Sequence, residues 1–182
     1  MNVILKEKKV FDKELIVEEA QISDGNEKPY TKLRLTREDA VAVLLFNTDS
    51  EKFILTRQFR YAISSRIKEN ILEIVAGKID RGEEPIETAI REVKEETGYK
   101  ITKNRTRLLV SCFSSPGYSS ECFYIYFATI TNNDKTSAGG GLKDQNEEIE
   151  IVEINFNDFR SMIKKCEIQD AKTYLAGLLY SR

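Results

Sequence analysis

Apolar and polar residues alternate in short runs over the first forty positions. Two such runs lie at 14–18 and 31–35, and a turn signal at 24–26 (DGN) separates them. A period of two residues is typical of β-strands with one face toward solvent. These positions therefore predict paired strands. Because they contain too few apolar groups to fold alone, we expect them to pack on the main body of the chain or on a second subunit.

The rest of the chain reads as strands interleaved with a few helices. The wholly apolar run 41–46 predicts a central, buried strand. Further strands are predicted at 52–60, 71–75, 107–113, 122–131 and 149–154, an exposed loop at 61–69, and helices at 157–165 and 170–180. This order predicts an α/β fold, an α/β/α sandwich around a mixed β-sheet with N-terminal β-strands added. We expect an N-terminal strand segment at 1–40 and the main domain at 41–182.

The most informative segment is the helix that Gly98 ends. Its predicted buried stripe has helical spacing and consists of Ile86, Ala89, Ile90, Val93 and Thr97. Three acids, Glu92, Glu95 and Glu96, share another side. Such close like charges repel, so a positive partner is expected there, and hard carboxylate oxygens suit Mg²⁺ or Mn²⁺. The alternative is a solvated acidic face that Arg91 and Lys94 screen.

The spacing around these acids resembles the signature of the Nudix hydrolases at every specified position. The match runs from Gly77 through Glu83 and the segment 91–96 (REVKEE) to Gly98 and Tyr99. It should recur by chance in about one in ten million chains of this size. The resemblance implies the sandwich fold and hydrolysis of a nucleoside diphosphate linked to another group, with a divalent ion, Mg²⁺ first or Mn²⁺, as cofactor.

The same resemblance implies a set of site residues. The metal ligands would be the Ala76 carbonyl, Glu92 and Glu96, with Glu95 acting through water or on another ion, and Arg91 would orient the carboxylates. A base is also needed for the attacking water. The first choice is Glu147, in the loop that the tract 137–141 (SAGGG) opens, where it would also lie near the metal. The second choice is Glu121. Any of these acids could instead be a surface residue, and Glu147 with Glu148 could merely solubilise the loop.

Outer motifs narrow the resemblance to the ADP-ribose and nucleotide-sugar pyrophosphatases. The turn at 115–117 (SPG), followed by Glu121, is typical of that branch. The segments 55–60 (LTRQFR), 138–141 (AGGG) and 167–173 (EIQDAKT) are similar to the bacterial GDP-mannose pyrophosphatase group. By this resemblance Arg60, Lys172 and Glu121 contact the substrate, although Arg60 could also serve packing and Arg57 could be a strand residue. The same resemblance implies that the N-terminal strands swap across a homodimer and help to form the partner's nucleotide pocket.

Composition excludes several other classes. The chain has 182 residues, 28 Lys plus Arg against 30 Asp plus Glu, and no histidine. A net charge of −2 gives no positive surface field that would attract nucleic acid. The lack of histidine excludes catalysis by imidazole and zinc sites built from imidazole. Three cysteines without metal spacing predict reduced, buried thiols. The early charges in the N-terminal sequence predict neither a signal peptide nor a membrane span, and so a cytoplasmic protein.

These observations favour a Mg²⁺-dependent hydrolase of a nucleoside diphosphate sugar, GDP-mannose first. It would release a nucleoside monophosphate and a sugar 1-phosphate. ADP-ribose hydrolysis to AMP and ribose 5-phosphate is the alternative. A non-catalytic nucleotide sensor would show gaps in the signature, and a hydrolase of damaged nucleoside triphosphates would leave the SPG turn and the glycine-rich loop unexplained.

Overall fold

The computed structural model describes residues 1–25, 28–142 and 148–181. The chain divides into two compact units. The first comprises Met1–Asp39 and Cys112–Phe123, and the second comprises Ala40–Ser111 and Tyr124–Arg182. No helix among the described residues is both long and apolar enough to cross a membrane.

Within the described part of the chain, the first unit contains a three-stranded antiparallel sheet in the order β1-β2-β3. Its strands are β1 (Val3–Asp12), β2 (Ile16–Ser23) and β3 (Tyr30–Thr36), so the predicted pairing is confirmed. The strands are tied by polar contacts, since Arg34 on β3 donates to Glu7 at 2.8 Å and to Glu18 at 2.6 Å. Every residue of β1 is exposed, so this sheet has little core of its own.

The second sheet has the order β10-β5-β4-β9-β8, with β6 paired to β5 and β7 paired to β4. Its strands are β4 (Ala40–Asn47), β5 (Lys52–Gln58), β6 (Ile71–Glu73), β7 (Val75–Lys78), β8 (Thr106–Phe113), β9 (Cys122–Ile130) and β10 (Glu150–Asn155). Among the described residues, the longer helices are α1 (Pro85–Thr97), α2 (Phe156–Lys164) and α3 (Ala171–Leu179). Short 3-10 turns are η1 (Tyr61–Ile63), η2 (Lys103–Arg105) and η3 (Asn132–Asp134).

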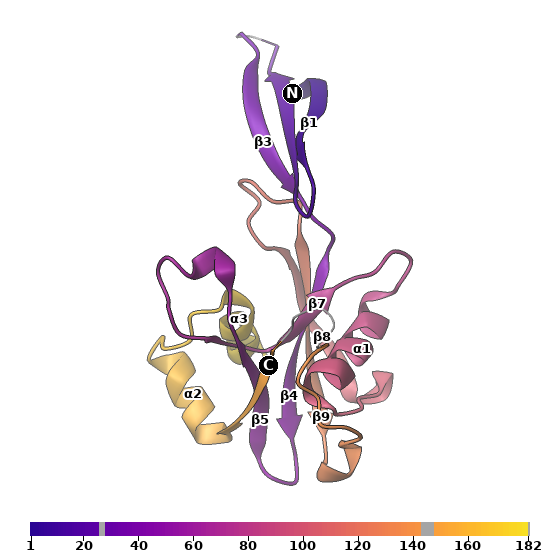
Figure 1. Ribbon diagram of the computed structural model, residues 1–182, viewed down its shortest axis with the longest axis vertical. Coiled ribbons are helices and arrows are strands. Elements are labelled where there is room, and N and C mark those ends of the chain that lie inside the picture. The colour runs from indigo at the N-terminus through magenta and orange to yellow at the C-terminus, as the bar shows by residue number, and fades with distance from the viewer. Residues whose placement is uncertain (26–27, 143–147, 182) are drawn as a thin grey trace. The chain divides into compact units, whose positions relative to one another are not determined.

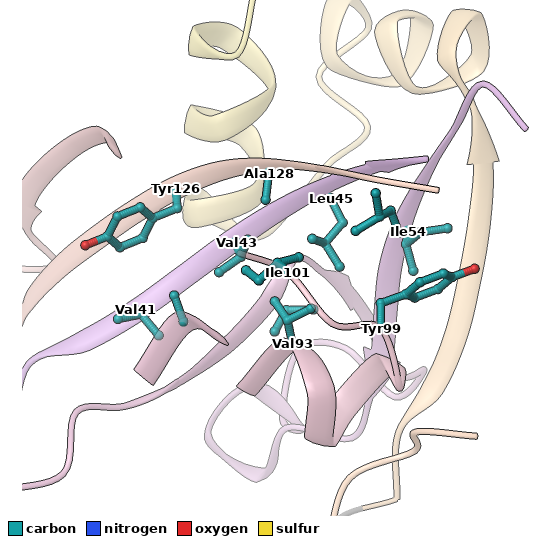
Figure 2. Packing of buried hydrophobic residues seen from close by; sticks show 12 residues of the cluster. Val41, Val43, Leu45, Ile54, Val93, Tyr99, Ile101, Tyr126 and Ala128 are labelled. Atoms are coloured by element: carbon teal, nitrogen blue, oxygen red, sulfur yellow. The ribbon is translucent and has the colours of Figure 1, made fainter. Parts of the chain in front are cut away.

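Helix α1 covers one face of the β4–β5 region, and α2 and α3 cover the other (Figure 1). The alternation along β4 explains both layers, because successive side chains of a strand point to opposite faces. Val41, Val43 and Leu45 belong to the buried cluster that contains Val93 of α1 (Figure 2). On the α2 face, the Phe53 ring packs against several other aromatic rings, those of Phe46, Phe156, Phe159 and Tyr180. The predicted α/β sandwich with a mixed sheet is therefore confirmed.

The structure corrects three details of the sequence prediction. The strand expected at 71–75 is two strands, because the Ile74 amide donates to the Thr173 hydroxyl at 2.8 Å and leaves the ladder. Strand β5 ends at Gln58, short of the expected residue 60. The described cysteines are free thiols, but they are not buried: Cys112 and Cys122 are half-buried and Cys166 is exposed.

Candidate active site

Helix α1 is anchored by its apolar stripe and carries acids on another face. Pro85 opens it, where a missing backbone N–H costs nothing, and Gly98 ends it with a left-handed φ of 73°. Ala89 and Val93 are fully buried, as their spacing predicts. Of the three acids, Glu92 and Glu95 are half-buried, whereas Glu96 is only 4% exposed.

Arg91 supplies the positive charge that this group of acids requires. Its Nη1 donates to Glu92 at 2.6 Å and to Glu95 at 3.2 Å. Its Nε and Nη2 donate to the two oxygens of Glu83, at 3.2 and 3.0 Å. The hydrogen bonds from Arg91 hold the pKa of Glu83 below its usual value, and those same bonds raise the pKa of Arg91. Arg91 therefore links the start of α1 to its acidic turn.

Gly77, on β7, lies directly against the Glu92 carboxylate. A Cβ at this position would overlap the carboxylate carbon and both of its oxygens, so any larger residue would displace the Glu92 carboxylate from its present place. The Glu92 oxygens are thus held beside the backbone that follows Ala76, which itself pairs with Ala42 of β4.

The donor atoms gathered at β7 and α1 fit a hard divalent cation. They are carboxylate oxygens and backbone carbonyls, which Mg²⁺ prefers. Among the described side chains, no three Asp, Glu, Cys or His already converge in a ready-made ion site. Instead, Arg91 bridges Glu92 and Glu95. A bound cation would therefore share these carboxylates with the Arg91 guanidinium.

A cleft of about 660 Å³ opens beside the acidic turn. One wall is the side of α1 that carries Arg91, Lys94 and Glu95, and the other is the glycine-rich loop. The loop residues in the lining are Ser137, Ala138, Gly139 and Gly141. A phosphate-bearing ligand in this cleft would meet a lysine, an arginine and a carboxylate on one side and backbone on the other.

A second polar cluster joins β6 to α3 and includes two of the three residues expected to contact substrate, Arg60 and Lys172. Arg60 donates to one oxygen of Glu73 from Nε and Nη2, at 2.9 and 2.7 Å. The Lys172 ammonium lies 3.6 Å from the other oxygen and 2.7 Å from Asp170. Glu73 and Asp170 are only 4% and 8% exposed. The structure thus brings Arg60 and Lys172 together through one buried carboxylate.

Comparison with known proteins identifies the family. The model of the NUDIX domain matches residues 36–175, most of the chain. The chain belongs to the Nudix family. Residues 77–99, where the sequence resembles the Nudix signature, include Gly77 on β7 and all of α1.

Curated Nudix relatives include enzymes with stated substrates. The chain is 31% identical over 170 residues to the ADP-ribose pyrophosphatase of Bacillus subtilis. This match covers 92% of this chain and 83% of the Bacillus protein. The chain is 36% identical over 141 residues to the GDP-mannose pyrophosphatase of Escherichia coli K12, a match that covers 76% of this chain and 71% of the Escherichia coli protein. These matches confirm the prediction of a Nudix hydrolase that acts on pyrophosphate bonds.

Two further comparisons extend over nearly the whole chain. The methanol dehydrogenase activator of Bacillus methanolicus is 27% identical over 94% of this chain and 88% of its own. A crystal structure described as an ADP compounds hydrolase superposes with a TM-score of 0.78, at 23% identity, over 99% of this chain and 92% of that one. At that identity the superposition supports the Nudix fold alone.

Glu147 and Glu121 are the two residues predicted to act as the base. Glu147 lies outside the described residues, and Glu148, just after it, is exposed. Glu121 belongs to the first unit, where its carboxylate lies 3.5 Å from Arg37 and its side chain is 12% exposed. Their roles stay predictions.

Two residues that contact this region, Glu73 and Lys135, were not singled out from the sequence. Glu73 gave a signal, since it is a charged residue inside an otherwise apolar strand, but its partners lie 13 and 99 positions away. Lys135 gave none. Its ammonium reaches the Thr97 carbonyl at 2.5 Å, at the end of α1.

Proposed function

We propose that this Nudix hydrolase cleaves the pyrophosphate bond of a nucleoside diphosphate sugar, with GDP-mannose as the favoured substrate. The products would be a nucleoside monophosphate and a sugar 1-phosphate. The observation that carries the proposal is the acidic turn of α1, which Arg91 organises beside a cleft large enough for part of a nucleotide sugar. The choice of substrate is supported by the 36% identity to a GDP-mannose pyrophosphatase.

The chain's own residues would divide the work as follows. Glu92, Glu96 and the Ala76 carbonyl hold a divalent cation, Mg²⁺ first or Mn²⁺, and Glu95 assists through water or a second ion. Arg91 keeps the carboxylates oriented through its fork. When bound, the cation supplies the charge that stabilises the pyrophosphate oxygens in the transition state.

The attacking water needs a base, and we propose Glu147 for it, on sequence grounds, with Glu121 as the second choice. Arg60 and Lys172 would contact a phosphate or sugar oxygen of the substrate. The buried Glu73 carboxylate supports this role, because it contacts the positive groups of both Arg60 and Lys172 and holds them in place. The guanidinium fork of Arg60 and the ammonium of Lys172 both suit contacts to such phosphate or sugar oxygens.

ADP-ribose is the second candidate, and one observation favours it. The match to the ADP-ribose pyrophosphatase extends over 92% of this chain, whereas the GDP-mannose pyrophosphatase match extends over 76%. In the resemblance given above, the N-terminal strands help to form the nucleotide pocket. A relative that aligns over more of the chain is therefore a better guide to which nucleotide base is bound, and this favours adenine.

We also propose that the protein is a homodimer formed through β1–β3 and that it acts in the cytoplasm. Exposed apolar side chains on β1 support the first point: Val3, Ile4, Leu5, Val10 and Phe11. Free thiols are in keeping with a reducing compartment.

A substrate panel tests the proposal. GDP-mannose, ADP-ribose, ADP-glucose, NADH and 8-oxo-dGTP are each incubated with the protein and Mg²⁺, and the released phosphomonoester is measured. We expect the highest kcat/KM for GDP-mannose and a loss of turnover with EDTA. Strong turnover of 8-oxo-dGTP alone would contradict the proposal, and a preference for ADP-ribose would select the second candidate.

A further inference from the structure

The end of helix α1 is held by the loop 135–141, which starts at Lys135 and contains the glycine tract. A helix leaves its last carbonyl groups without partners inside the helix. Here the amide of Gly140 donates to the Glu96 carbonyl at 2.8 Å, and the amide of Gly141 donates to the Glu95 carbonyl at 3.2 Å. One residue beyond the helix, Gly98 accepts from the amides of Thr136 and Ser137, at 2.8 and 3.2 Å.

Two glycines allow the loop and the helix end to touch backbone to backbone. Gly98 and Gly139 both have left-handed φ angles, 73° and 71°. A Cβ on Gly139 would lie 2.7 Å from the Glu96 carbonyl oxygen and 2.8 Å from the Gly98 nitrogen. A Cβ on Gly98 would overlap the Ser137 carbonyl. Neither position can carry a side chain unless the loop moves away from α1.

Lys135 adds a charged contact at the same place. Its ammonium donates to the Thr97 carbonyl at 2.5 Å and lies 4.5 Å from the centre of the Tyr99 ring. Tyr99 is 6% exposed, so its ring is a fixed support for the lysine stem. A cation at this end of a helix also interacts favourably with the helix dipole. The contact thus fixes the loop at its start, while Gly140 and Gly141 fix it further along.

An ordinary helix cap would only stabilise the helix. The difference here is that the carbonyls of Glu95 and Glu96, which the loop holds, belong to the residues that carry the proposed metal-binding carboxylates. We infer that the loop 135–141 is a positioning element that sets the place of these two carboxylates, and that Gly139 and Lys135 are its key residues. The inference rests on the proposed function, which makes these acids metal ligands.

The first test compares Gly139→Ala with Gly82→Ala. Gly82 has a similar φ of 85° and precedes α1, but a Cβ there meets no atom within 4 Å. Both variants therefore carry comparable backbone strain, and only Gly139→Ala pushes against α1. Mn²⁺ affinity is measured by calorimetry, together with the Mg²⁺ concentration for half-maximal turnover and the thermal unfolding curve.

Supporting groups around metal ligands typically change metal affinity or activity by about 10-fold to 100-fold when they are lost. We expect Gly139→Ala to weaken Mn²⁺ binding at least about 10-fold, and Gly82→Ala to change it less than about twofold. The amides of 136–141 should exchange faster with deuterium in Gly139→Ala alone. If Gly139→Ala folds and binds Mn²⁺ as the wild type does, the inference is wrong.

Lys135→Met provides a test that does not depend on Gly139→Ala folding. Methionine keeps an unbranched apolar stem over Tyr99 and removes the ammonium. We expect weaker Mn²⁺ binding and a higher Mg²⁺ requirement, an unchanged KM for the nucleotide sugar, and recovery in Lys135→Arg. Unchanged Mn²⁺ affinity in Lys135→Met would overturn the role of Lys135. Absence of Mn²⁺ binding by the wild type would instead refute the proposed function, and the deuterium exchange of 136–141 would still report whether the loop holds the helix.

Discussion

Single residues decide how three acids can share one turn of α1. The sequence predicts the acids and Arg91 near them, because spacing along a helix fixes which side chains are neighbours. It does not predict that one nitrogen of Arg91 bridges Glu92 and Glu95 while the rest of the fork binds Glu83. That division depends on side-chain rotamers, which spacing leaves open.

Arg60 and Arg57 offer a comparison at the residue scale. Their side chains are 40% and 39% exposed, but Arg60 binds the buried Glu73, whereas Arg57 pairs with Glu150 at the surface. We expect Arg60→Lys to raise the KM for the nucleotide sugar about 10-fold, because lysine cannot reproduce the fork. Arg57→Lys should leave KM unchanged. Steady-state kinetics of both variants check this, and equal KM values would assign Arg60 to packing.

Secondary-structure elements were predictable wherever the pattern was local. The buried stripe of α1 and the apolar strand β4 follow from neighbouring residues. The break at Ile74 and the contact of Gly139 with α1 did not follow, since they arise from Thr173, 99 positions away, and from a loop packed on a helix end. Such long-range backbone contacts leave no periodic signal in a single sequence.

A half-buried ion pair joins the turns η2 and η3. Asp134 accepts from Arg105 at 2.8 and 2.7 Å and from the amide and hydroxyl of Thr131. The pKa of Asp134 lies well below its usual value, mainly because of the hydrogen bonds from Arg105. A carboxyl whose pKa is lower in the folded state stabilises the fold above its unfolded pKa, about 4, and the stabilisation is lost as the pH falls toward the folded pKa.

We therefore expect Asp134→Asn to lower the free energy of unfolding by about 1–3 kcal/mol at pH 7. The difference from the wild type should shrink as the pH falls below about 4. Urea unfolding at several pH values measures it. Asp12→Asn is the control, because the ion pair of Asp12 with Lys9 is exposed at the surface, so this change should lower the free energy of unfolding much less. A penalty for Asp134→Asn that does not depend on pH would contradict the assignment.

In the molecule as a whole, the N-terminal sheet leaves many of its apolar side chains exposed within the described chain. Leu5 on β1 is 54% exposed. We expect sedimentation at micromolar concentration to give a dimer, and Leu5→Lys to shift it toward monomer. Leu178→Lys, a change at a similarly exposed leucine on α3, should remain dimeric. A wild-type monomer under these conditions would refute the dimer.

The account as a whole depends on the acids of α1 acting as ligands of a catalytic metal. The most direct measurement is the Mg²⁺-dependent turnover of Glu96→Gln, compared with Glu87→Gln on the same helix, where Glu87 pairs with Lys103 at the surface. Glutamine keeps the shape of Glu96 and removes its charge. The account predicts a loss of at least about 1,000-fold in kcat for Glu96→Gln, with cooperative unfolding retained and Glu87→Gln fully active. Near-normal turnover by a folded Glu96→Gln would contradict it.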